Sequence, residues 1–221
     1  MNSTPELFPQ APQHIRTLNP YVPGKPIEET QRELGLKRVI KLASNENPLG
    51  PSPKALAAAR KSLKDQHRYP DAAAFRLRHA LSRSLSSSKL KVAPDELVMG
   101  NGSNEVIDLL IRTYTKPGDA IATSQGAFIA YRICAQAHGV QTLETPLKEG
   151  LRFDLEALAA LVKREERIKI VFIANPNNPT GTYSNESELR KFFDDLSSLQ
   201  SSRPVLVVLD YAYWEYVTAK D

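Results

Sequence analysis

Two almost uninterrupted apolar segments constrain the fold of this chain more than any other feature. Residues 168–174 read IKIVFIA, and residues 205–209 read VLVVL. A strand with one face in water alternates apolar and polar residues, whereas strands as apolar as these are buried on both faces. Such strands belong to parallel sheets that helices cover on both sides. We therefore expect an α/β fold with a mostly parallel sheet sandwiched by helices.

The rest of the chain has the alternation of strands and helices that such a fold requires. Apolar runs predict strands, and apolar residues at three-to-four spacing predict helices between them. The expected strands are 39–42, 96–99, 120–123, 140–145, 168–174 and 205–210, and the expected helices are 27–34, 54–63, 73–85, 103–114, 128–137, 155–163 and 186–199. The first 37 residues are rich in proline and otherwise irregular. We expect them to form an extended arm that lies on another domain or another subunit.

Composition excludes several classes of protein. The chain has 221 residues, of which 41% are hydrophobic and 24% charged, which is ordinary for a soluble globular protein. Its one cysteine, Cys134, excludes an internal disulfide and a multi-cysteine metal site, and its histidines are too scattered to suggest metal ligands. No apolar stretch is long enough to span a membrane and no secretory signal is recognised, so we expect a cytoplasmic protein. The net charge of +4 comes from scattered residues, which favours solvated helix faces over a nucleic-acid surface.

The ends of three expected strands carry unusual sequences, and ligands of open α/β sheets bind beyond such ends. The first is residues 99–105, MGNGSNE, where a strand runs into a helix. Two glycines there leave the first N–H groups of the helix open to a phosphate. Glu105 stands where a dinucleotide-binding fingerprint needs a third glycine. A plain turn in which Ser103 caps the helix explains this segment equally well.

The other two strand ends carry amide and carboxylate groups. Residues 174–181 read ANPNNPTG, which predicts a rigid loop with amides that face a ligand, although good turn formers alone also explain it. Asp210 ends a wholly apolar strand, where a carboxylate is costly without a cation or several donors. The alternatives for Asp210 are a helix cap or a metal ligand, but no second carboxylate or histidine pair accompanies it.

Taken together, these strand ends resemble the cofactor site of the fold-type-I pyridoxal-phosphate-dependent aminotransferases. Residues 102–105, GSNE, resemble the phosphate loop of that family, 178–181, NPTG, its Asn-Pro-x-Gly loop, and 210–213, DYAY, its Asp-x-Ala-Tyr segment. Residues 18–26, 41–52 and 68–71 resemble the opening motifs of the histidinol-phosphate aminotransferases. The resemblance runs from about residue 18 to residue 213 and covers only the N-terminal portion of such an enzyme. It implies two regions: 1–50, an arm and part of the small domain, and 51–221, a large cofactor-binding domain truncated at its C-terminal side.

The resemblance also implies roles for individual residues around pyridoxal 5'-phosphate. Ser103 and Asn104 give backbone N–H groups to the phosphate, Phe128 stacks on the pyridine ring, and Asp210 pairs with the ring nitrogen. The segment before Phe128, residues 123–126, departs from the family, where relatives often place Pro and Thr.

Four further roles concern the cofactor oxygen, the neighbouring subunit and the substrate. Asn178 and Tyr213 hydrogen-bond the 3-oxygen of the cofactor. Tyr69 reaches the phosphate of the neighbouring subunit's cofactor, and Tyr21 lies near the substrate. The implied unit is therefore a homodimer.

The implied activity is amino transfer between glutamate and imidazole acetol phosphate, in histidine biosynthesis, with a small-molecule amino donor and a phosphorylated keto substrate. Aromatic amino acid aminotransferases and threonine-phosphate decarboxylases share the same site and are alternatives. The family's Schiff-base lysine follows the Asp-x-Ala-Tyr segment in a Ser-Lys context, and the only lysine after Tyr213, Lys220, stands after Ala219. We therefore expect no catalytic residue within this chain and no turnover by it alone. A truncated, non-catalytic piece or a dimerisation scaffold is the alternative from another class.

Overall fold

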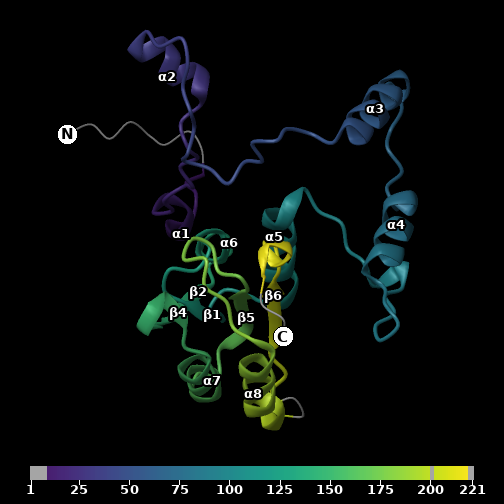
Figure 1. Cartoon of the computed structure of the whole chain (residues 1–221). Coiled ribbons are helices and arrows are strands. Elements are labelled where there is room, and N and C mark those ends of the chain that lie inside the picture. The colour runs from purple at the N-terminus through teal and green to yellow at the C-terminus, as the bar shows by residue number, and fades with distance from the viewer. Residues whose placement is uncertain (1–8, 200–201, 219–221) are drawn as a thin grey trace, which may run out of the picture. The chain divides into compact units, whose positions relative to one another are not determined.

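The computed structural model describes residues 9–199 and 202–218. It divides the chain into two units, 1–21 with 100–221 and 22–99. This division differs from the predicted boundary after residue 50, which stays a prediction. Figure 1 traces the elements of both units along the chain.

The first unit contains a parallel sheet of four strands in the order β2-β1-β5-β6. These strands are β1 (Ala120–Ser124), β2 (Gln141–Thr145), β5 (Ile168–Ala174) and β6 (Leu206–Asp210). The central strand β5 is buried at every residue except half-buried Lys169, as its apolar sequence predicts. A small antiparallel hairpin, β3 (Leu147–Lys148) with β4 (Arg152–Phe153), was not predicted because each strand has only two residues.

Helices cover both faces of this sheet, which confirms the predicted fold class (Figure 1). One face packs against α5 (Gly102–Tyr114) and α6 (Ala130–Ala137), with Ile121, Ile170 and Phe172 of the sheet. The other packs against α7 (Leu155–Arg164) and α8 (Glu186–Leu196), with Ala122, Val171 and Ile173. From Ile170 to Ala174, even residues of β5 enter one core and odd residues the other, because side chains alternate along a strand.

Part of the N-terminal arm packs against the unit that contains the sheet, which agrees with the expectation that the arm lies on another domain. Residues Gln13–Arg16 form the short helix α1, which lies against α6. The Gln136 side-chain amide donates to the carbonyl oxygen of His14 at 3.1 Å and to the Thr17 hydroxyl at 3.3 Å. Gly139, beside the His14 ring, has a φ of +70°, a conformation that favours glycine. The polar contacts of this segment could not be anticipated from its sequence.

The second unit consists of helices joined by irregular segments: α2 (Ile27–Leu34), α3 (Pro53–Ser62) and α4 (Phe75–Leu85). The bounds predicted for the first of these helices are confirmed. The Arg78 guanidinium donates to the Pro94 carbonyl at 2.6 Å, and the Ser82 hydroxyl to the Val92 carbonyl at 2.7 Å, so α4 holds the segment that follows it. No residue of this unit is buried.

Two strands predicted in the second unit, 39–42 and 96–99, are wrong. Residues 39–42 are irregular, and residues 94–96 form a 3-10 turn before an irregular segment. A strand needs a neighbour that satisfies its backbone N–H and C=O groups, and no other strand exists within this unit. Leu42 is 90% exposed and Val98 72% exposed, so neither segment has a sheet to join.

Candidate functional site

The carboxyl ends of three parallel strands bring the predicted site segments to one edge of the sheet. Ala174 pairs with Asp210, so the loop after β5 and the segment after β6 begin side by side. β1 lies on the other side of β5, and the loop that carries Phe128 follows it. The crevice beyond such ends is where ligands of open α/β sheets bind.

Helix α5 brings its first turn to this edge as well. A short loop, residues 115–119, joins the end of α5 to the start of β1. The 13 residues of α5 rise about 20 Å, so the helix runs back along the sheet to the carboxyl ends of the strands. Gly102 turns the chain into the helix at a φ of +73°, a conformation that favours glycine.

Glu105, which occupies the place of a third glycine, has a structural role in this turn. Its carboxylate accepts from the backbone N–H of Asn101 at 2.5 Å and from the Asn101 side-chain amide at 2.9 Å. Ser103 and Asn104 of the first turn are exposed. Ser103 makes no side-chain cap, so the plain-turn explanation that made it the cap is wrong.

Asp210 is half-buried and firmly held. One carboxylate oxygen, Oδ2, accepts from the Tyr131 hydroxyl at 2.6 Å, and the other, Oδ1, accepts from the Ala212 N–H at 3.1 Å. The Asp210 carbonyl accepts from the Asn175 N–H at 2.9 Å. The donors that a carboxylate needs at the end of an apolar strand are therefore present.

Sequence reasoning missed Tyr131, which the structure connects to Asp210. Tyr131 is 0% exposed and stacks on Phe172 of β5, with ring centroids 4.6 Å apart. Burial raises the pKa of the Tyr131 hydroxyl far above its usual value, and the charge of Asp210 raises that pKa further. The hydroxyl is therefore a permanent donor. The sequence did contain a signal, since Tyr131 lies within a helix expected to cover the sheet. A tyrosine buried there needs a hydrogen-bond partner for its hydroxyl.

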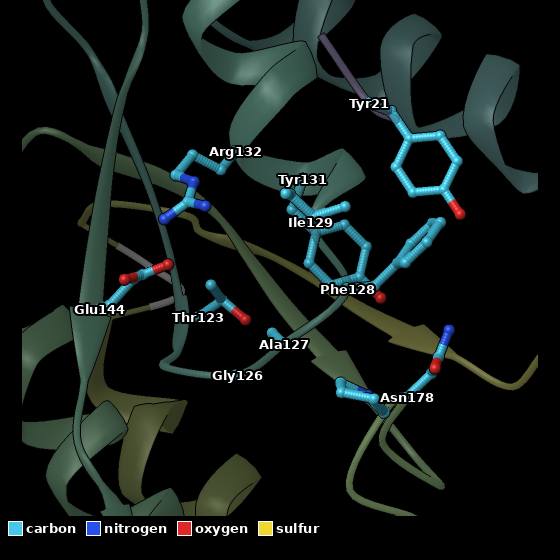
Figure 2. Close-up of a pocket in the computed structure, with 11 residues that line it drawn as sticks. Tyr21, Thr123, Gly126, Ala127, Phe128, Ile129, Tyr131, Arg132, Glu144 and Asn178 are labelled. Carbon is cyan, nitrogen blue, oxygen red and sulfur yellow. The ribbon is translucent and has the colours of Figure 1, made fainter. Parts of the chain in front are cut away.

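A hollow of about 370 Å³ opens beside these groups. Figure 2 shows Tyr21, Phe128 and Asn178 on one side of it and Arg132 and Glu144 on the other. Of the predicted site residues, Tyr21, Phe128 and Asn178 line this hollow, together with Thr123, Gly126, Ala127, Ile129, Tyr131, Arg132, Glu144 and Pro179. Three residues from distant parts of the sequence thus meet in one place.

Hydrogen bonds from its own asparagine side chains fix the conformation of the loop after β5. The Asn175 side chain bonds Ser184 twice, donating to its carbonyl at 3.0 Å and accepting from its N–H at 2.7 Å. The Asn177 amide donates to the Gly126 carbonyl at 3.1 Å and to the Thr180 hydroxyl at 2.9 Å. Asn177 therefore ties the loop after β5 to the loop after β1, and Asn178 faces the hollow.

The other predicted site residues are not among those that line the hollow: Ser103, Asn104, Asp210, Tyr213 and Tyr69. Tyr213 is half-buried, and its ring centroid lies 6.4 Å from that of Tyr216. Tyr69 belongs to the second unit and is fully exposed, at 101%. Lys220 lies outside the described residues.

Residues 9–199 and 202–218 contain no group of three His, Cys, Asp or Glu side chains that could hold a metal ion. Over the same residues, every helix is too short or too polar to cross a membrane.

Comparison with known proteins identifies the family. Residues 37–221 match the model of the aminotransferase class I and II family. The chain belongs to this family.

Two curated relatives show a closer similarity over most of the chain. The chain is 50% identical over 212 residues to the histidinol-phosphate aminotransferase of Anaeromyxobacter sp. (strain Fw109-5), which covers 96% of the chain and 55% of that relative. It is 47% identical over 209 residues to the histidinol-phosphate aminotransferase of Bdellovibrio bacteriovorus, with 94% and 54% covered. The chain thus spans about half the length of the curated relatives it matches.

Solved structures agree with this assignment. The histidinol-phosphate aminotransferase of Sinorhizobium meliloti, solved in complex with pyridoxal-5'-phosphate, superimposes with a TM-score of 0.80 at 29% identity, covering 96% of this chain and 53% of that one. The aromatic aminotransferase of Pyrococcus horikoshii OT3 superimposes with a TM-score of 0.70 at 20% identity, over 87% of this chain and 52% of that one, and shows the fold alone.

Proposed function

We propose that these residues form the cofactor-binding part of a pyridoxal-phosphate-dependent histidinol-phosphate aminotransferase. The enzyme passes an amino group between histidinol phosphate and 2-oxoglutarate, giving imidazole acetol phosphate and glutamate. The names of the curated relatives at 47–50% identity support histidinol phosphate as the substrate. The observation that carries the proposal is Asp210, a carboxylate held by Tyr131 beside a hollow that Phe128 and Asn178 line.

The chemistry of these side chains fits pyridoxal phosphate. The cofactor has a basic ring nitrogen, a flat aromatic face, a phenolic oxygen and a phosphate. Asp210 offers a carboxylate to the nitrogen, the half-buried Phe128 offers a ring to the face, and Asn178 offers an amide to the oxygen. The first turn of α5, with Ser103 exposed behind Gly102, offers backbone N–H groups to the phosphate.

Each residue then has a defined task. When bound, the cofactor supplies an electron sink for the carbanion that forms at the substrate α-carbon. Asp210 keeps the ring nitrogen protonated, which strengthens that sink. Phe128 stacks on the ring and excludes water from one face.

Polar groups hold the other parts of the cofactor and the substrate. Asn178 and Tyr213 donate to the 3-oxygen, and the N–H groups of Ser103 and Asn104 bind the phosphate. Tyr21, which lines the hollow, contacts the substrate.

The lysine that binds the cofactor aldehyde and moves the substrate proton is not assigned to any residue of this sequence. After Tyr213 only Lys220 follows, outside the family's Ser-Lys context. We propose that these 221 residues bind the cofactor but do not turn over substrate by themselves. Borohydride reduction with pyridoxal phosphate, followed by peptide mapping, tests this. We expect sparse labelling over surface lysines, and a single stoichiometric adduct together with turnover would contradict it.

We further propose that the working enzyme is a cytoplasmic homodimer. The fully exposed Tyr69 and the absence of buried residues from the unit 22–99 support a partner that covers this part of the chain. In this dimer Tyr69 reaches the cofactor phosphate of the partner subunit. Sedimentation at micromolar concentration tests the assembly, and a fully active strict monomer would refute it.

The activity is tested on the reading frame that encodes these residues, carried to its stop codon. We expect amino transfer from histidinol phosphate to 2-oxoglutarate, with a kcat/KM well above that for phenylalanine or tyrosine as donor. The Asp210→Asn variant serves as the inactive control. A preference for aromatic amino acids would assign the chain to another branch of the same family.

A further inference from the structure

The hydrogen bond from Tyr131 holds the Asp210 carboxylate, but Tyr131 itself has been given no role toward the cofactor so far. It joins residues 79 positions apart and connects α6 to the end of β6. The 2.6 Å distance falls within the range of a charge-assisted O–H···O⁻ bond, about 2.5–2.7 Å. Such bonds are roughly twice as strong as those between neutral groups.

The Tyr131 ring cannot move easily, so its hydroxyl is a fixed donor. The ring is fully buried and lies nearly parallel to Phe172, with an interplanar angle of 12°. Phe128 meets it edge-on, with centroids 5.8 Å apart and an interplanar angle of 89°. Tyr131 thus contacts both the Asp210 carboxylate and the Phe128 ring, the two groups proposed to bind the cofactor. Figure 2 shows Phe128 next to Tyr131.

The bond also determines which acceptor sites of the Asp210 carboxylate remain available to a ligand. Tyr131 engages Oδ2 and the Ala212 N–H engages Oδ1, so rotation of the carboxylate is blocked from both sides. Each oxygen keeps one further acceptor site, since a carboxylate has about four in all. A ligand N–H can therefore bind without displacing either donor.

We propose that Tyr131 is a positioning residue that orients and stabilises the Asp210 carboxylate for the protonated ring nitrogen of the cofactor. This inference rests on the proposed function. It predicts that Tyr131 acts on ligand binding only through the ring nitrogen. A merely structural role would weaken all ligands of the hollow alike.

The test compares two probes on the chain and on its Tyr131→Phe variant. One probe is pyridoxamine 5'-phosphate, which needs no lysine, and the other is its carbocyclic analogue with CH in place of the ring nitrogen. Tyr131→Phe keeps the stacked ring and removes only the hydroxyl. We expect the variant to bind pyridoxamine phosphate about tenfold more weakly, as for loss of a hydrogen bond to a charged group. The carbocyclic analogue should bind both proteins equally.

A matched control is Tyr114→Phe, which removes a hydroxyl at the exposed far end of α5 and should bind both probes like the wild type. If Tyr131→Phe does not fold, Tyr131→His keeps a ring and an N–H donor and should retain the preference for the nitrogen-containing probe. Equal losses for both probes, or no loss for either, would overturn the role of Tyr131. Failure of the wild type to bind pyridoxamine phosphate would overturn the proposed function itself, and the role of Tyr131 with it.

Discussion

Replacing Asp210 by asparagine removes the charge of the site while keeping its shape. The side chain remains at the end of β6, and the Asn oxygen can still accept from Tyr131 or from the Ala212 N–H, as the aspartate does at 2.6 and 3.1 Å. The substitution therefore changes the electrostatics of the ring-nitrogen contact and leaves the packing of Tyr131 on Phe172 unchanged.

The expected loss of binding free energy follows from how deeply the Asp210 carboxylate is buried. Asp210 is half-buried, so an effective dielectric constant of about 20 is appropriate. A cation about 4 Å away then gains roughly 4 kcal/mol, which corresponds to about three pKa units for the ring nitrogen. The asparagine N–H recovers about 1 kcal/mol by donating to the deprotonated nitrogen. A net loss of about 3 kcal/mol is roughly a hundredfold in the dissociation constant.

The assay is titration of each protein with pyridoxamine 5'-phosphate, followed by the fluorescence of the probe. Asp194→Asn is the matched control, since it removes one negative charge from an exposed position on α8, a helix packed on the opposite face of the sheet from α6. Far-UV circular dichroism checks that each variant folds. Binding by Asp210→Asn within about twofold of the wild type would refute the assignment of Asp210 to the ring nitrogen and leave it as a local cap.

Three further predictions concern stability and reactivity. Leu158→Ala, at a fully buried position of α7, should lower the free energy of unfolding in urea by about 3 kcal/mol; a loss below 1 kcal/mol would contradict the core described for this face. Asn185→Ala removes the side-chain oxygen that accepts from the Glu188 N–H and caps α8, so it should cost about 1 kcal/mol in the same assay, and an unchanged midpoint would contradict that cap. Burial, and to a lesser extent the charge of Asp108, raise the pKa of the Cys134 thiol, so less thiolate is present at a given pH. Iodoacetamide at pH 8.5 should therefore alkylate Cys134 more slowly in the native chain than in urea, and equal rates would refute this.

The parts of the fold that were predicted well are those determined by local sequence. The bounds of β5 agree with the prediction because its apolar run, interrupted only by Lys169, is flanked by polar residues. Helix α2 agrees because Pro26 precedes it and Gly35 ends it in the left-handed conformation. Segments 39–42 and 96–99 were predicted as strands because they are apolar, but a strand also requires a partner, which sequence patterns do not provide.

The site, like the fold, has residues that the sequence predicts and contacts that it does not. Asp210, Phe128 and Asn178 could be proposed because motifs mark the ends of strands, and the meeting of Tyr21, Phe128 and Asn178 in one hollow agrees with that proposal. The Tyr131–Asp210 bond could not be proposed, since it joins a helix on one face of the sheet to the end of β6 and depends on how α6 lies on that face. The docking of α1 on α6 through Gln136 depends on tertiary packing in the same manner.

The central claim is that a pyridoxal-type cofactor binds beside this hollow, with its ring nitrogen held by Asp210. A crystal structure of the chain with pyridoxamine 5'-phosphate tests it most directly. The account predicts the ring nitrogen within hydrogen-bonding distance of Asp210, the ring face against Phe128 and the phosphate at the first turn of α5. A ligand bound elsewhere, with Asp210 contacting only Tyr131 and the Ala212 N–H, would contradict it.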